Sequence, residues 1–289
     1  MFTLFANVKV QQVDINHILA FLEFLVFNKF SPSAIVNIVS AVKSRLQAYG
    51  VSITPWTDTR VSLFTKSLYH CKKFKAHLPR VIDVKMLTDI VKVCDSTSFG
   101  FVFKAAYLIA FYSFLRISNL VPHCTKSFSL MHQLARGDVF FATPGLHLLI
   151  KWSKTLQKRN KAVIIKVSEI PGSILCPVSA VKELLRLTPG HADSPLFQVK
   201  LGGKWVPLTD SRLRKHLYCI LKRLNLHECG ITFHTFRKSG ATLAFNSSAS
   251  LQSIKAHGTW SSDTVWRYII QNQDSSAEVA SILAKASTT

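Results

Sequence analysis

Acidic residues are scarce in this chain. It has 15 Asp and Glu among 289 residues, against 36 Lys and Arg, for a formal net charge of +21. Such an excess predicts a polyanionic partner, most simply double-stranded DNA or another nucleic acid. An unusually basic soluble protein and a membrane-surface binder are the alternatives. The basic residues are spread along the whole chain and not gathered in a tail, which favours the nucleic-acid interpretation.

Long apolar runs are missing as well. No stretch is long and apolar enough to cross a bilayer. The run "HILAFLEFLVF" is short and interrupted by Glu23, so we interpret it as a core helix. A charged-then-apolar secretory signal is also absent. We therefore expect an intracellular protein without a membrane partner.

Cysteine pairs of the C-x-x-C type do not occur. Zinc-ligand spacing is therefore absent, and a disulfide framework is not expected in a chain of this length. We expect no bound metal and six reduced thiols, namely Cys71, Cys94, Cys124, Cys176, Cys219 and Cys229.

The sequence does contain enough apolar residues, 48%, for a sizeable core. Three segments with apolar residues at helical spacing come first: "DINHILAFLEFLVFNK", "SPSAIVNIVSAVKSRLQAYG" and "DTRVSLFTKSLYHCKKF". The basic stretch "KKFKAHLPRVID" then interrupts the pattern with Pro79. We predict an N-terminal helical bundle over residues 1–78 and a second domain over residues 79–289.

The second domain mixes helices with short strands. We predict helices over "DVKMLTDIVKVCD" and "FGFVFKAAYLIAFYSFLRISNLV", and strands over "GDVFFATPG", "LHLLIKWSKT" and "NKAVIIKVS", with "KTLQKRNK" as a hairpin tip. A further helix is expected from "CPVSAVKELLRL", and a second hairpin over "SPLFQVKLGGKWVPLT". The predicted fold class is mainly α with a small antiparallel β-sheet (α+β).

A histidine and an arginine three residues apart, His234 and Arg237, open a predicted helix in "FHTFRKSGAT". The spacing puts both side chains on one face of the helix. A helix start with cationic side chains is an anion site. The simpler interpretation is an exposed polar helix start.

Four other residues carry weaker signals. Arg116 lies near the end of a predicted apolar helix, where it either has a partner or extends its charge to solvent. Lys154 lies at the predicted hairpin tip, where most lysines are merely solvated. In "HGTWSSDTVWRYI", the "SSD" predicts a helix start after Trp260 and places Tyr268 inside that helix, where a packing role is usual.

The order of these residues is more specific than any one of them. "FLRISNL", the hairpin "KWSKT", "HTFRKSGAT" and "GTWSSDTVWRYI" resemble the motifs of the tyrosine recombinase (phage integrase) family, over roughly residues 83–275. The motif style is most similar to recombinases of eukaryotic mobile elements of the Crypton and DIRS kind. The resemblance implies a tyrosine-recombinase-like catalytic domain and an N-terminal DNA-clamping domain of the SAM-like kind.

The resemblance also implies a role for each residue. Arg116 and Arg237 would grip the scissile phosphate, and His234 would hydrogen-bond to it and assist proton movement. Lys154 would protonate the leaving 5′-oxygen. Trp260 would donate to a phosphate oxygen, and Tyr268 would be the nucleophile that forms a 3′-phosphotyrosyl intermediate. No metal, ATP or other cofactor is implied.

The chain departs from the family pattern at Asn119, where the family often has an acidic residue, and in a Trp260-to-Tyr268 spacing about one residue shorter. His257 is a rival for the Trp260 role, and Lys151 and Lys158 are rivals for the Lys154 role.

Phosphate contacts are predicted in the interdomain stretch, in the hairpin and in "SRLRKHLYCILKR". These DNA-binding candidates are Lys72, Lys73, Lys75, Arg80, Lys158, Arg159, Arg212, Arg214 and Lys215. The segment "DSSAEVASILAKA" after Tyr268 is amphipathic. In the family such a helix docks on a neighbouring subunit, which suggests a homo-tetramer assembled on DNA.

The resemblance thus implies a site-specific DNA recombinase or integrase, located in the nucleus if the host is eukaryotic. Two alternatives stay open. One is a catalytically inactive, mobile-element-derived DNA-binding protein, and the other is a type IB topoisomerase-like enzyme that acts as a monomer.

Overall fold

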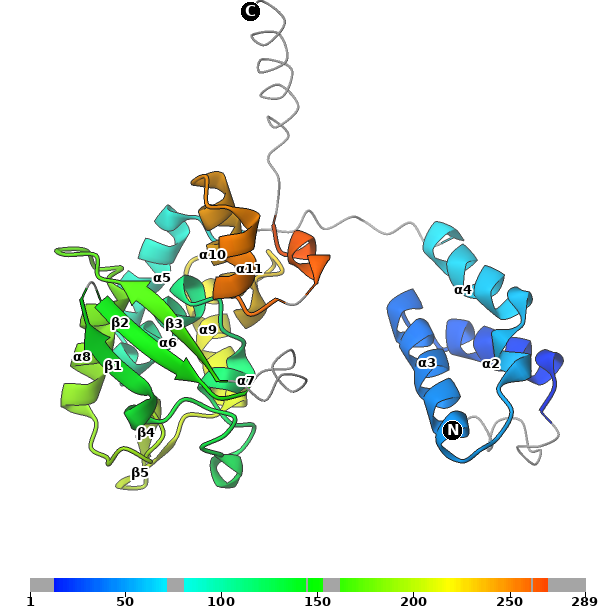
Figure 1. Ribbon diagram of the computed structural model, residues 1–289, viewed down its shortest axis with the longest axis horizontal. Coiled ribbons are helices and arrows are strands. Elements are labelled where there is room, and N and C mark those ends of the chain that lie inside the picture. Colours follow the sequence, from blue (N-terminus) through cyan, green and yellow to red (C-terminus); the bar gives the residue numbers. More distant parts are fainter. Residues whose placement is uncertain (1–12, 72–80, 144, 153–161, 261, 270–289) are drawn as a thin grey trace, which may run out of the picture. The chain divides into compact units, whose positions relative to one another are not determined.

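The computed structural model describes residues 13–71, 81–143, 145–152, 162–260 and 262–269. The chain forms two compact units, residues 1–77 and residues 78–289. Helices predominate, and the strands form small antiparallel sheets (Figure 1), so the predicted fold class is confirmed.

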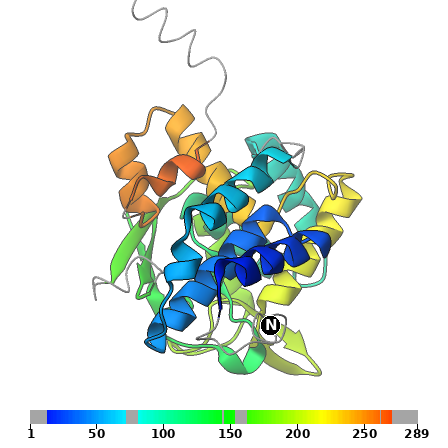
Figure 2. The same cartoon turned by 90° about the vertical axis from the view of Figure 1, so that its right-hand side faces the viewer.

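Unit 1 is built from helices around one apolar core. Its elements are α2 (Ile15–Phe27), α3 (Pro32–Ala48), the 3₁₀ helix η2 (Thr54–Thr57) and α4 (Thr59–Cys71). Asp14 and Ser31 cap α2 and α3 through their side-chain oxygens. In Figure 2 these helices are the blue to cyan segments, and α2 packs on α3, α4 and η2 around the buried Phe21 and Trp56.

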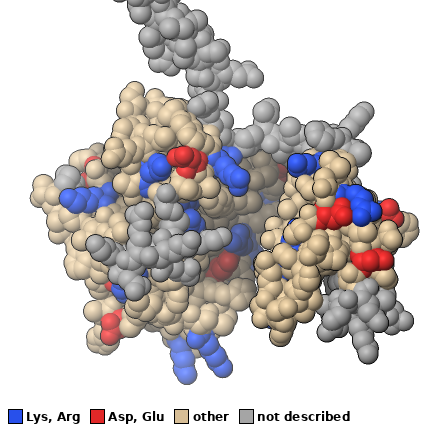
Figure 3. Space-filling model, turned by 45° about the vertical axis from the view of Figure 1, so that its right-hand side comes forward, with Lys and Arg blue, Asp and Glu red and all other residues tan. Residues whose placement is uncertain are grey.

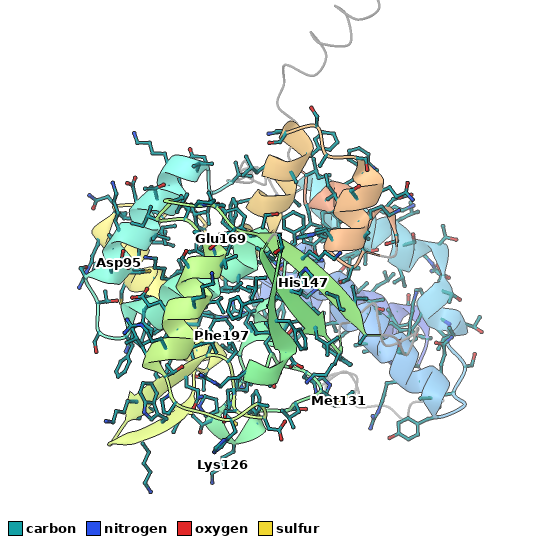
Figure 4. The ribbon with its side chains drawn as sticks, turned by 60° about the vertical axis from the view of Figure 1, so that its left-hand side comes forward. Asp95, Lys126, Met131, His147, Glu169 and Phe197 are labelled. Atoms are coloured by element: carbon teal, nitrogen blue, oxygen red, sulfur yellow. The ribbon has the colours of Figure 1, made fainter. Side chains whose placement is uncertain are left out.

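Unit 2 has the central helix α6 (Gly100–Tyr112), which is buried over most of its length. Such a helix is apolar all round because other elements cover every side. It packs on α5 (Val84–Asp95), α8 (Pro177–Leu187) and α10 (Phe233–Asn246). Phe197, labelled in Figure 4, belongs to the same core.

The remaining elements of unit 2 surround this centre. They are α7 (Ile117–Leu120), η3 (Thr125–Ser127), η4 (Arg136–Asp138), β1 (Val139–Ala142), β2 (Gly145–Ile150), β3 (Val163–Ser168), β4 (Gln198–Leu201), β5 (Lys204–Pro207), α9 (Asp210–Arg223), α11 (Leu251–His257) and η5 (Asp263–Arg267).

The larger sheet has the order β1-β2-β3, and both pairs of strands are antiparallel. Leu148 pairs with Ile165, and both side chains join the core, whereas His147 belongs to the opposite face (Figure 4). β4 and β5 form the second predicted hairpin. The pairing of Ile150 with Val163 confirms the hairpin that encloses residues 151–162.

Two predictions about helices are wrong. The helix predicted over residues 99–121 ends at Tyr112, and the chain turns through Phe114, which has a left-handed backbone (φ 51°), before α7 begins after Arg116. Tyr268 does not lie inside a helix. It is the C-cap residue of the short 3₁₀ helix η5. In both places, side chains from distant segments bind the chain where the helix was expected to continue.

Candidate active site

Arg237 is the centre of the candidate site. It lies in the second turn of α10, and only 1% of its surface is exposed. Its Nη1 donates to the carbonyl of Phe114, and its Nη2 donates to the carbonyl of Gly258 at 2.8 Å. The guanidinium carbon lies 4.0 Å from the centre of the Trp260 ring and 5.3 Å from that of Tyr268. A single arginine thus joins three segments that are far apart in the sequence.

No carboxylate forms an ion pair with Arg237 in the part of the chain that the structure describes. Burial, and then the positive charge of Arg116, lower the pKa of the Arg237 guanidinium, and Tyr268 partly opposes this effect. A buried cation without a negative partner is costly. The arrangement therefore favours binding of an anion.

Two buried donors at this place have no acceptor among the described residues. They are the Nε of Arg237 and the indole Nε1 of Trp260, whose side chain is 6% exposed. Leaving a buried N–H unpaired costs roughly 1–3 kcal/mol, and such groups are rare in folded proteins. Both donors fit an acceptor that comes from outside the chain.

His234 lies in the first turn of α10, and its ring meets the Tyr268 ring edge-on at 5.1 Å. Partial burial, followed by the charges of Arg237, Arg116, Lys238 and Arg214, lowers the pKa of His234. The residue keeps contact with solvent, and the lowered pKa favours the neutral imidazole. A neutral ring nitrogen can accept a proton from a neighbouring hydroxyl.

Tyr268 is half-buried against the apolar cluster formed by Phe114, Ile254, Trp260 and neighbouring side chains. Its ring lies 4.9 Å from the Trp260 ring. Thr242 of α10 donates its hydroxyl to the Tyr268 carbonyl at 3.1 Å. The main chain of Tyr268 is therefore held by α10, and its ring is held by Trp260.

Arg116 lies directly before α7, at its N-cap position, and is partly exposed. Its charge lowers the pKa of both Arg237 and His234, so it belongs to the same cluster. The structure thus brings together five of the six predicted catalytic residues. The sixth, Lys154, lies outside the described residues, as do Lys72, Lys73, Lys75, Arg80, Lys158 and Arg159.

Two of the rival residues are already engaged. Lys151 forms an ion pair of 2.8 Å with Asp138, whose side chain is 7% exposed. The ring Nε2 of His257 lies 2.8 Å from the Tyr112 carbonyl, to which it donates. Trp260, rather than His257, lies beside Tyr268. The third rival, Lys158, lies outside the described residues together with Lys154.

The predicted phosphate contacts on α9 differ from one another. Arg214 is exposed and paired with Asp210, and Lys215 is exposed. Arg212 is partly buried, and its Nη1 has no acceptor among the residues described. Figure 3 shows Lys and Arg at several separate places on the visible surface of each unit.

Sequence reasoning missed Lys238 and Phe114. Lys238 follows Arg237 directly, is partly buried, and lowers the pKa of His234. The adjacency of Arg237 and Lys238 was the available signal. Phe114 acts through its carbonyl and its left-handed backbone, and no residue-type signal marks either property.

The described residues contain neither a candidate metal site nor a candidate membrane span. Across the described ranges, no group of three or more His, Cys, Asp or Glu side chains is placed to hold a metal ion. In the same ranges, no helix is long and apolar enough to span a membrane.

Solved structures of tyrosine recombinases and integrases have the same fold. A complex of the Tn1549 transposon integrase with circular-intermediate DNA is 15% identical, with a TM-score of 0.60, over 94% of this chain and 86% of that one. XerH site-specific recombinase in a post-cleavage complex with a palindromic difH substrate is 16% identical, with a TM-score of 0.65, over 97% and 76%. A lambda integrase dimer bound to a core site is 15% identical, with a TM-score of 0.56, over 89% and 65%.

At these identities the likeness shows the fold alone. No protein-family model matches the sequence, and no curated protein matches it.

Proposed function

We propose that this chain is a site-specific DNA recombinase or integrase, which cleaves and rejoins DNA strands through a 3′-phosphotyrosyl intermediate. The observation that carries the proposal is the buried Arg237 with its free Nε beside the free indole Nε1 of Trp260, both next to Tyr268. A phosphate diester would supply the missing acceptors and the missing negative charge at once.

In the proposed reaction, the Tyr268 hydroxyl oxygen attacks the scissile phosphorus, and the bond to the 5′-oxygen breaks. His234 accepts the phenolic proton or hydrogen-bonds to the phosphate, and Lys154 protonates the departing 5′-oxygen. Arg116, Arg237 and Trp260 stabilise the extra charge on the phosphorane oxygens. Attack of a 5′-hydroxyl on the phosphotyrosine reverses these steps, so the diester energy is conserved without ATP.

The basic composition and the fold support DNA as the substrate. Unit 1 and α9 would clamp the duplex through phosphate contacts. A tetramer on DNA, a nuclear location in a eukaryotic host and kinship with Crypton and DIRS recombinases belong to the same proposal. They rest on the motifs quoted above.

Two other functions predict different behaviour. A mobile-element remnant would bind DNA without cleaving it, and Asn119 at a position that is often acidic in the family favours this candidate. A type IB topoisomerase-like enzyme would form the same adduct as a monomer, without paired sites.

Covalent trapping tests the proposal. The protein is incubated with end-labelled, nicked duplexes that cover the DNA flanking its gene, and the products are separated on denaturing gels. We expect a labelled protein–DNA adduct that disappears in Tyr268→Phe and persists in Tyr49→Phe, which removes an exposed hydroxyl from unit 1. DNA binding without any adduct would refute the proposed activity and favour the inactive remnant.

A further inference from the structure

Asn119 makes a contact that the sequence does not predict. Only 3% of its surface is exposed, and its Nδ2 donates to the carbonyl of Trp152 at 2.8 Å. Trp152 follows the last residue of β2, Ile150, by two positions. A side chain of α7 therefore binds the main chain where it leaves the sheet.

The backbone of Asn119 is fixed on both sides. Its N–H donates to the Arg116 carbonyl at 2.9 Å, and its own carbonyl accepts from the N–H of Leu134 at 2.8 Å. Because Arg116 and Asn119 share one turn, the distance from Arg116 to the end of β2 is set through this amide.

The end of β2 has two further anchors. Lys151 is paired with Asp138 at 2.8 Å, and Asp138 also accepts from the N–H of Ala135 at 2.9 Å. The Trp152 ring meets the His132 ring edge-on at 4.6 Å. Residues 151 and 152 are thus held immediately before the segment that contains Lys154.

We propose that Asn119 is a positioning residue, which holds the exit of β2 in register with Arg116 and requires a hydrogen-bond donor to do so. This inference rests on the proposed recombinase function. Its consequence runs against the family pattern, because an ionised carboxylate at residue 119 would place an acceptor against the Trp152 carbonyl. On this inference Asn119 is an adaptation of this chain, and its departure from the family pattern no longer favours the inactive remnant.

The test compares Asn119→Asp and Asn119→Ala with the parent protein. Asn119→Asp has nearly the same shape as Asn but donates a hydrogen bond only when protonated. At pH 8 we expect both variants to form the phosphotyrosyl adduct about 10- to 100-fold more slowly, since small misplacements cost rates of this order. DNA affinity and melting temperature are measured beside the rate.

The pH profile shows whether residue 119 acts as a hydrogen-bond donor or only fills space. The carboxyl of Asn119→Asp would be buried against a carbonyl, which raises its pKa. Among the described residues, the charged and titratable groups around it are Arg116, His132 and Lys151, and Lys151 is already neutralised by Asp138. Acidification should therefore shrink the deficit of Asn119→Asp relative to the parent but not that of Asn119→Ala.

Asn225→Asp is the matched control, because it makes the same chemical change at an exposed left-handed position (φ 56°) that Asp tolerates. Its adduct rate should equal that of the parent. If the parent forms the adduct and both Asn119 variants match it at every pH, the positioning role is refuted while the recombinase function stands. Equal deficits of the two variants at every pH would refute the donor requirement. A parent that forms no adduct would overturn the function and this inference together.

Discussion

Arg237 shows how a buried cation can be oriented without being neutralised. Its two terminal nitrogens bind main-chain carbonyls, and its face lies on the Trp260 ring. An aspartate in place of these two carbonyls would hold the Arg237 side chain as firmly. It would also cancel the positive charge that binds a phosphate. The site therefore keeps its positive charge for a ligand.

Replacing Arg237 by Lys tests this geometry. One ammonium cannot reach both carbonyls and also replace the Nε donor. We expect Arg237→Lys to reduce the rate of adduct formation about 10²–10³-fold, as for loss of a transition-state donor, with a change of only a few-fold in DNA affinity. Rates and affinities are measured by gel assay and fluorescence anisotropy.

Arg186→Lys, at an exposed position of α8, is the control and should leave both quantities unchanged. An Arg237→Lys variant as fast as the parent would show that the planar guanidinium is not needed.

The residue order predicted which side chains lie together better than it predicted the groups that support them. Order and spacing selected His234, Arg237, Trp260 and Tyr268, and the structure places these side chains around one another. The acceptor of Arg237 at Phe114 could not be predicted, because a carbonyl is present at every residue. Only the fold determines which carbonyl is within reach.

Among the elements, α9 is joined to the core by a partly buried histidine. The His216 ring stacks on Phe103 at 3.6 Å, and its two nitrogens lie 2.9 Å from the Tyr107 hydroxyl and 3.1 Å from the Thr97 hydroxyl. Tyr107 in turn stacks on Phe236 of α10. This chain of contacts connects the basic helix to the helix that carries Arg237.

Burial, and then the charge of Arg223, lower the pKa of His216 to about 4 from the ordinary value of 6.5. Between these values the unfolded chain binds a proton that the folded chain does not. Stability should therefore fall as the pH decreases from 6.5 to about 4, by an amount on the order of 2 kcal/mol from this residue.

Urea unfolding of the parent and of His216→Gln at pH 7.5 and 4.5 measures this effect. The variant should be less stable at pH 7.5, because it loses the ring stack, but its stability should depend less on pH. Burial also lowers the pKa of His234 and His257, so some pH dependence will remain. An unchanged difference between the two pH values would contradict the assignment to His216.

The helix predicted over residues 99–121 shows where periodicity is insufficient. Its apolar residues continue past Tyr112 without a proline, and Gly100 marks only its start. The break comes from tertiary contacts, since His257 and Arg237 bind the carbonyls of Tyr112 and Phe114. Those partners are more than 120 residues away, so a local pattern could not indicate the break.

At the scale of the whole molecule, each unit has its own apolar core. The excess of positive charge follows directly from the composition. Helical spacing predicted most helices of both units. The identity of unit 1 as a DNA clamp stays a prediction.

The charge excess makes DNA binding sensitive to salt. Affinity should fall steeply and log-linearly as the salt concentration rises, because bound phosphates release counterions. Lys215→Ala, at an exposed site of α9, should weaken binding equally for all sequences and reduce the slope of log K against log salt by about one.

Anisotropy titrations at several salt concentrations give this slope. Lys29→Ala, at an exposed left-handed turn of unit 1, is a comparison that reports whether any loss of charge has the same effect. A slope that Lys215→Ala leaves unchanged would remove α9 from the DNA contact.

The main-chain acceptors of Arg237 also bear on how the protein tolerates mutation. A carbonyl survives every substitution at its own position, so residues 114 and 258 are under no demand to supply a hydrogen-bonding side chain. What is required near the site is a small residue. A Cβ at Gly258 would lie 1.8 Å from the Trp260 ring, and a Cβ at Gly240 would lie 2.0 Å from the Phe111 carbonyl. Damaging mutations near the site should therefore concentrate at small residues, and the polar network itself can persist while the sequence around it drifts.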